Sequence, residues 1–181
     1  NEITSRRTAA VSALAASLIV ADAPRNQLVV GAGRVGRLVP EAYRAVFEIA
    51  SVAIWDRHED QAHSAVEELR GKGIHARVST DLAADARNAD VITCATLARE
   101  PIIRGEWLQA GCHLDLIGSF TPEMREADDQ CFVRAAIYMD TDEALKKSGE
   151  LLGPVSRSVF APSDVKAGLA DLCRDPRRGR N

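Results

Sequence analysis

The sequence is poor in aromatic side chains, lacks a paired cysteine motif, and has no apolar run long enough to cross a bilayer. Only 4% of its 181 residues are aromatic whereas 46% are hydrophobic, which predicts one core built mainly from aliphatic side chains. Its four cysteines show no C-x-x-C spacing, so we expect reduced thiols and a cytoplasmic location. A formal net charge of -3 favours neither a nucleic-acid partner nor an anionic membrane surface.

One apolar run invites a different interpretation. Residues 9–20 follow two arginines and precede an Ala-Asp-Ala triplet, so the run is similar to a secretory signal with its cleavage site. It is short, rich in Ala and Ser rather than Leu, and directly adjacent to the first predicted strand. We therefore predict a helix over residues 5–19 with Thr4 or Ser5 as N-cap, which would place Arg7 in its first turn. There Arg7 either pairs with a substrate carboxylate near the free helix-start amides or is simply solvated.

A glycine-punctuated turn after residues 28–30 carries the clearest chemistry. In a G-x-G-x-x-G turn between a strand and a helix, Gly31 permits the bend and Gly33 lets backbone amides approach a pyrophosphate. Gly36 lets the following helix pack closely on the sheet. The same glycines also occur in ordinary strand-turn-helix units, but the apolar strand before them and the helical pattern after them favour a dinucleotide site.

The end of the second predicted strand, residues 52–55, bears on the choice of nucleotide. Asp56 follows Gly36 at about the 20-residue spacing of an acid that hydrogen-bonds a ribose hydroxyl, which favours NADH. Arg57 could instead hold a 2'-phosphate, which favours NADPH. Both nucleotides remain open.

The remaining pattern alternates strands with helices. Further strands are predicted at residues 74–79, 90–96, 112–117 and 136–140, and further helices at 59–70, 81–88, 122–129, 141–147 and 164–173. Six strands in this alternation predict an α/β fold with a doubly wound parallel sheet. Ligands bind beyond the carboxyl ends of such strands, so we expect residues 94–96 and 118–119 to lie beside the cofactor.

Other polar residues favour structural roles. His113 and Asp115 alternate on one predicted strand and are interpreted as satisfied core groups. The histidines and cysteines show no metal-ligand spacing, so no metal is expected. Ser119 lacks a G-x-S-x-G context, which argues against a nucleophile.

Several blocks in order resemble the ornithine cyclodeaminase/mu-crystallin family. They are residues 7–15, 31–36, 55–57, 95–102, 105–107 and 116–122. The resemblance implies a Rossmann NAD(P)-binding domain joined to a second domain that forms a homodimer and supplies much of the substrate site. That N-terminal domain would be missing here, so we expect the chain to be a fragment, and the family's substrate-binding lysine and arginine in it cannot be assigned.

The resemblance also implies a reaction. Arg7 matches the arginine that holds the substrate carboxylate, and Ser119 stands where cyclodeaminases carry an aspartate. The Gly-Ser-Phe-Thr-Pro block at residues 118–122, with residues 125–129 after it, is more similar to members that reduce Δ1-pyrroline-2-carboxylate or Δ1-piperideine-2-carboxylate to proline or pipecolate. The alternatives are a mu-crystallin-like nucleotide-binding protein without useful turnover, an ornithine cyclodeaminase and an alanine dehydrogenase. The catalytic proton donor is unknown and would lie in the missing domain or be solvent.

The expected organisation is a connecting helix and link at 1–26, a dinucleotide-binding domain at 27–155, and a C-terminal helix and frayed tail at 156–181. We expect Arg7 to bind a small cyclic imino acid. The expected cofactor contacts, for NADPH or NADH, are Gly31, Ala32, Gly33, Arg34, Val35, Gly36, Asp56, Arg57, Cys94, Ala95, Thr96, Gly118 and Ser119.

Overall fold

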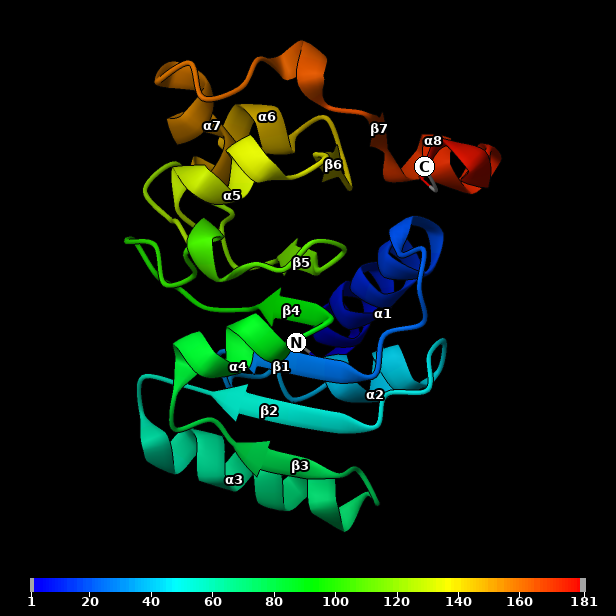
Figure 1. Cartoon of the computed structure of the whole chain (residues 1–181), viewed down its shortest axis with the longest axis vertical. Coiled ribbons are helices and arrows are strands. Elements are labelled where there is room, and N and C mark those ends of the chain that lie inside the picture. Colours follow the sequence, from blue (N-terminus) through cyan, green and yellow to red (C-terminus); the bar gives the residue numbers. More distant parts are fainter. Residues whose placement is uncertain (1, 180–181) are drawn as a thin grey trace.

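A five-stranded parallel sheet forms the centre of the computed structural model, which describes residues 2–179 (Figure 1). The strand order is β3-β2-β1-β4-β5. The bounds are β1 Asn26–Val30, β2 Ser51–Trp55, β3 Ala76–Val78, β4 Val91–Cys94 and β5 His113–Leu116. The predicted α/β class and parallel sheet are confirmed. The chain runs outward from β1 to β3 and returns to β4, so the sheet has its switch point between β1 and β4.

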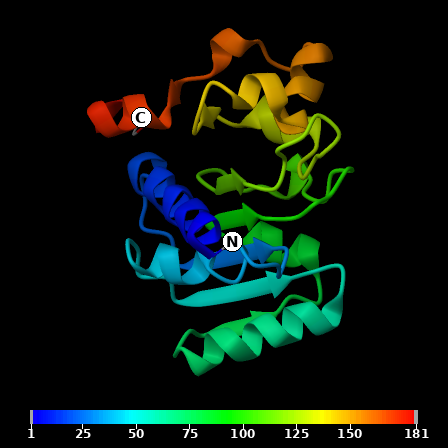
Figure 2. The same cartoon turned by 180° about the vertical axis from the view of Figure 1, so that it is seen from behind.

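Helices cover both faces of this sheet. They are α1 Glu2–Ile19, α2 Val39–Arg44, α3 Glu59–Gly71, α4 Leu82–Asn88, α5 Asp129–Arg134, α6 Ala144–Lys147, α7 Gly149–Ser156 and α8 Leu169–Arg174. Figure 2 shows α1 in front of the sheet. The helices α1, α2 and α3 pack with Val29 in one cluster, whereas α4, α5 and α7 contribute to the other cluster, with Leu28 and Val30. Successive β1 residues thus point to opposite faces, and both faces are buried.

The prediction of a sixth strand in the main sheet is wrong. Within residues 136–140 only Tyr138–Met139 is a strand, β6, and it pairs with β7, Ala167–Gly168, in a separate two-stranded sheet. Ile137 is buried, but the flanking Ala136 and Asp140 are exposed. The apolar stretch is therefore too short to fill both faces of a central sheet.

The helix predicted directly after the glycine turn begins later than expected. Residues 34–38 form successive turns, with the Arg37 amide donating to the Gly33 carbonyl at 3.0 Å. The helix α2 starts at Val39, and Pro40 occupies its first turn, where a missing N–H costs no hydrogen bond.

The helix predicted at residues 122–129 is also wrong. Its backbone pairs with a distant segment instead: Arg125 donates to Ala98, and the Ile102 and Ile103 amides both donate to the Glu126 carbonyl. The Arg125 amide and the Glu126 carbonyl are therefore not free for the hydrogen bonds of a helix over residues 122–129. The helix α5 starts only at Asp129, because the Asp128 carboxylate caps it by accepting the Cys131 amide at 3.2 Å.

The predicted last helix, residues 164–173, starts later as α8. Pro162–Asp164 forms a 3-10 turn, and β7 takes Ala167–Gly168. The chain then returns to the end of α1, where Gly179 lies so close to the Leu18 carbonyl that a side chain would clash.

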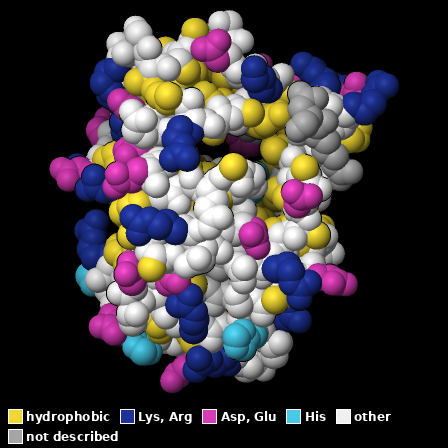
Figure 3. All heavy atoms as spheres, viewed as in Figure 1, with side chains coloured by type: hydrophobic (Ala, Val, Ile, Leu, Met, Phe, Trp, Pro, Cys, Tyr) yellow, Lys and Arg dark blue, Asp and Glu magenta, His cyan; other side chains and the backbone are white. Residues whose placement is uncertain are grey.

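Charges of both signs are scattered over the face shown in Figure 3. Among residues 2–179, no helix is long and apolar enough to traverse a bilayer.

Candidate functional site

The glycine turn lies at the carboxyl end of β1, pressed against the end of β4. Gly31 has φ +104°, and its amide donates to the Trp55 carbonyl at 2.8 Å. A Cβ on Gly31 would lie 2.7 Å from the Ala95 carbonyl oxygen, and a Cβ on Gly36 would collide with the Gly31 carbonyl. Only glycine fits at these two positions, so the tight turn is built into the sequence.

Gly33 differs from its two neighbours in the motif. It is exposed, its φ is not in the left-handed region, and a Cβ built on it would meet nothing within 4 Å. Arg34, next to it, is exposed as well. The loop is therefore closed by backbone on its inner side and open at Gly33, as a phosphate cradle needs. A dinucleotide fits this arrangement.

Asp56 has a structural role that its sequence position did not reveal. One carboxylate oxygen accepts the Ala32 amide at 2.7 Å, and the other accepts the His58 amide at 2.9 Å. Asp56 thus ties the glycine turn to the end of β2. Each oxygen keeps a further lone pair for a ribose hydroxyl. Arg57 is exposed beside it, so the structure leaves both nucleotides open.

The ends of β4 and β5 form the second half of the site. Cys94 is wholly buried and packs in the core, so it can offer a ligand only its backbone. The Ala95 amide donates to the Val30 carbonyl at 2.8 Å, which fixes the chain before Thr96. Gly118 follows β5 and lies against the Thr96 segment. A Cβ on Gly118 would clash with the Thr96 carbonyl oxygen.

Glu126 joins these two strand ends and was missed by sequence reasoning. It is 0% exposed. One of its carboxylate oxygens accepts the Thr96 amide at 2.6 Å and the Thr96 hydroxyl at 2.7 Å, and the other accepts the Gly118 amide at 2.7 Å. Burial raises the pKa of Glu126 to about 7. The signal for it in the sequence was its place in residues 125–129, which carry part of the resemblance to the reductase members but gave no role to Glu126 itself.

Ser119 lies at the end of β5 but turns its hydroxyl inward. The hydroxyl donates to the Met124 carbonyl at 2.6 Å and accepts the Glu150 amide at 3.0 Å, with the Ser148 hydroxyl 3.1 Å away. These three contacts match the full hydrogen-bonding capacity of a hydroxyl. The Ser119 side chain therefore links β5 to α7, and its backbone is the part that lines the strand end.

Arg7 lies on α1, but the prediction of free helix-start amides beside it is wrong. The helix begins at Glu2 instead of after a Thr4 or Ser5 cap, so Arg7 falls in its second turn. Arg6 pairs with Glu2 one turn earlier, at 2.8 Å, an exposed contact that adds little to the stability of the helix. Arg7 is exposed, and any role in binding a carboxylate depends on its guanidinium alone.

A partly buried polar cluster holds α1 against the sheet. Asp115 of β5 accepts hydrogen bonds from the Ser12 hydroxyl and from the Tyr43 hydroxyl, the latter at 3.3 Å. This matches the prediction that Asp115 is a satisfied core group. Burial raises the pKa of Asp115 to about 6 and lowers the pKa of His113 to about 4.

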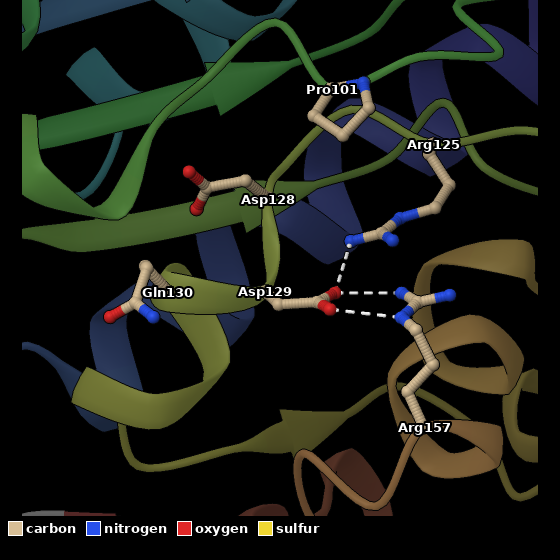
Figure 4. A pocket seen from close by; sticks show the side chains of 6 residues that line it. All are labelled: Pro101, Arg125, Asp128, Asp129, Gln130 and Arg157. Atoms are coloured by element: carbon tan, nitrogen blue, oxygen red, sulfur yellow. Dashed lines mark hydrogen bonds and ion pairs between the residues drawn. The ribbon is translucent and has the colours of Figure 1, made fainter.

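One cavity, about 430 Å³, lies apart from the glycine turn and is shown in Figure 4. It is lined by Pro101, Arg125, Asp128, Asp129, Gln130 and Arg157. Asp129 accepts from Arg125 at 3.0 Å and from Arg157 at 2.9 and 2.7 Å. The opposite charges satisfy one another across this cavity, so it has the character of a surface ion-pair network.

Comparisons with known proteins match this chain over nearly its whole length. The model of the ornithine cyclodeaminase/mu-crystallin family matches residues 1–181. The chain is 40% identical over 180 residues to a Delta(1)-pyrroline-2-carboxylate reductase of Paracoccus denitrificans, covering 98% of this chain and 57% of the relative. It is 35% identical over 173 residues to the ketimine reductase mu-crystallin of Mus musculus, covering 95% and 52%.

Two solved structures have the same fold. One is the Delta(1)-pyrroline-2-carboxylate reductase of Thermococcus litoralis in complex with NADH and L-proline, with a TM-score of 0.95 and 26% identity. The other is an archaeal alanine dehydrogenase dimer with bound NAD, with a TM-score of 0.91 and 29% identity. Each match covers 99% of this chain and 56% of the other. The chain thus spans little more than half the length of these relatives, and it belongs to the ornithine cyclodeaminase/mu-crystallin family.

Proposed function

We propose that the chain binds NADH or NADPH across the strand ends and that its protein reduces the C=N bond of cyclic imino acids. The products would be L-proline from Δ1-pyrroline-2-carboxylate or L-pipecolate from Δ1-piperideine-2-carboxylate. The observation that carries the proposal is the glycine turn, closed by backbone at Gly31 and Gly36 and open at Gly33. Two reductases of this kind, one 40% identical and one solved with NADH and L-proline, support it.

We assign the pyrophosphate to the turn from Gly31 to Gly36. The Ala32 amide is already held by Asp56, so the amides of Gly33, Arg34 and Val35 are the ones we assign to phosphate oxygens. The Arg34 side chain adds positive charge at the same opening.

The two ends of the nucleotide follow from the strand order. The adenosine ribose is assigned to Asp56 and Arg57 after β2, and the nicotinamide to Ala95, Thr96, Gly118 and the Ser119 backbone after β4 and β5. When bound, the nucleotide supplies the hydride. The chain orients the reactants and excludes water.

We assign the substrate carboxylate to Arg7. Its helix is fixed to β5 by the partly buried hydrogen bond between Ser12 and Asp115, which limits where Arg7 can lie relative to the strand ends. A guanidinium can bind a carboxylate with two parallel hydrogen bonds, which would orient the imine carbon.

Ser119 argues against cyclisation of ornithine. It stands where the cyclodeaminases carry an aspartate, and its hydroxyl is already engaged by Met124 and Glu150. The site therefore offers no carboxylate at that position for deamination.

We further propose a homodimer in the cytoplasm, formed through the part of the relatives that this chain does not span, with residues 27–155 as the nucleotide-binding domain. The archaeal alanine dehydrogenase, solved as a dimer, supports this assembly.

The test is a steady-state assay of the full-length protein with Δ1-pyrroline-2-carboxylate and each reduced nucleotide, followed by loss of nucleotide absorbance. We expect oxidation of at least one nucleotide together with formation of proline. Nucleotide binding without turnover would indicate a mu-crystallin-like binding protein instead. Ammonia release from alanine or ornithine would indicate a dehydrogenase or a cyclodeaminase.

A further inference from the structure

Glu126 is a buried carboxylate that lies between the two strand ends assigned to the nicotinamide. It is fully buried, and its carboxylate accepts three hydrogen bonds from two residues. Thr96 follows β4 and Gly118 follows β5, and both lie on the chain directly after their strands. One side chain therefore sets the separation of two adjacent strand ends.

Gly118, Thr96 and Glu126 pack so closely that no side chain fits at Gly118. A Cβ on Gly118 would clash with both the Thr96 carbonyl and the Glu126 carboxylate, so the glycine backbone, the Thr96 segment and the carboxylate are in mutual contact. Hydrogen bonds from backbone amides to a carboxylate are about twice as strong as those between neutral groups. Both strand ends are consequently held by the same carboxyl group, which is ionised above its pKa of about 7.

A second buried carboxylate holds Glu126 itself. Glu150 of α7 is 3% exposed, and it accepts the Glu126 amide at 2.6 Å and the Ala127 amide at 3.1 Å. The same helix start donates the Glu150 amide to Ser119. The strand ends, the segment around Glu126 and α7 thus form one connected network.

We propose that Glu126 is a positioning residue that holds Thr96 and Gly118 at the spacing needed by the nicotinamide half of the nucleotide, with Glu150 fixing Glu126 in place. This inference rests on the proposed function, because it takes the nicotinamide to lie at these strand ends. Glu126 touches neither reactant and acts through the two residues that it holds.

The substitution Glu126→Gln separates this role from general stability. A glutamine keeps the length of the side chain and one acceptor oxygen, but its NH2 group faces either the Gly118 amide or the Thr96 donors, where an acceptor is needed. We expect the dissociation constant for NADH to rise roughly tenfold, as for the loss of one charge-assisted hydrogen bond. The dissociation constant for ADP-ribose, which lacks nicotinamide and depends on the glycine turn and Asp56, should stay within about twofold.

Asp90→Asn is the matched control. Asp90 is also a carboxylate that accepts two backbone amides, from Arg25 at 2.9 Å and Asn26 at 2.8 Å, but at the amino ends of the strands. This variant should lose stability without changing the ratio of the NADH and ADP-ribose dissociation constants. If Glu126→Gln does not fold, Glu150→Gln weakens the hold on the Glu126 and Ala127 amides without changing a residue assigned to the nucleotide, and it should raise the same ratio to a smaller extent.

Titration calorimetry of the wild-type protein and the variants with NADH and with ADP-ribose distinguishes the outcomes. A rise of the ratio in Glu126→Gln, with no rise in Asp90→Asn, supports the inference. An unchanged ratio in Glu126→Gln, or an equal rise in both variants, overturns it while leaving the proposed function intact. A wild-type protein that binds neither ligand overturns the proposed function itself.

Discussion

At the scale of single residues, Gly33 is a position where an added methyl group should weaken nucleotide binding without affecting folding. A Cβ there has open space around it, so Gly33→Ala should leave the melting temperature nearly unchanged. The same methyl group would stand where the backbone approaches the pyrophosphate, and we expect at least a roughly tenfold loss of NADH affinity. Calorimetric titration and thermal melting measure the two effects.

Gly71→Ala provides the control for that substitution. Gly71 also has nothing within 4 Å of an added Cβ, but it ends α3, away from the turn. Alanine there should stabilise the protein slightly and leave NADH binding as it is. Equal NADH affinity in Gly33→Ala and wild type would contradict the phosphate assignment.

A second prediction at the scale of single residues concerns Arg7. In the full-length enzyme, Arg7→Ala should raise the KM for the imino acid by about tenfold or more while the dissociation constant for NADH stays the same. Arg6→Ala is its neighbour on the helix and breaks only the exposed pair with Glu2, so it should change neither value. Steady-state kinetics of both variants would refute the carboxylate assignment if Arg7→Ala and Arg6→Ala behaved alike.

At the scale of elements, the contact between α1 and β5 carries a pH dependence. The pKa of Asp115 in the folded protein is about 6, above its ordinary value of 3.8, because of burial. The folded state therefore binds the proton more tightly, and this contribution to stability is full below about pH 4 and is lost as the pH rises through 6. Ser12 and Tyr43 offset part of the loss by donating to the carboxylate.

Asp115→Asn removes that titration while keeping a side-chain oxygen for the Ser12 hydroxyl. Relative to wild type, the variant should gain stability between pH 4 and pH 8, by on the order of 2 to 3 kcal/mol. Urea unfolding at the two pH values measures the difference. Because His113 and Glu126 titrate in both proteins, their pH dependence cancels in this comparison. A difference that is the same at both pH values would contradict a raised pKa for Asp115.

The elements differ in how far sequence alone could predict them. The strands β1 and β2 were predictable because short apolar runs end at Gly31 and Asp56, residues that themselves shape the turn. Glu126 was not, because its hydrogen bond to Thr96 joins residues 30 positions apart, and nothing in the local pattern records that pairing. The inward role of Ser119 was hidden for the same reason.

At the scale of the whole molecule, the sheet brings four strand ends to one edge, and a nucleotide bound there would bridge both halves. NADH should therefore stabilise the folded chain. At a concentration about 100-fold above its dissociation constant, the gain is about 2.7 kcal/mol, which for a chain of this size raises the Tm by several degrees. Thermal melting with and without NADH checks this, and a Tm that NADH leaves unchanged at saturating concentration would count against binding.

The most direct test of the central claim is a calorimetric titration of the folded protein with NADH and NADPH, compared with Gly33→Ala. We predict saturable binding of at least one nucleotide by the wild-type protein and markedly weaker binding by the variant. No heat and no shift in melting with either nucleotide would contradict it.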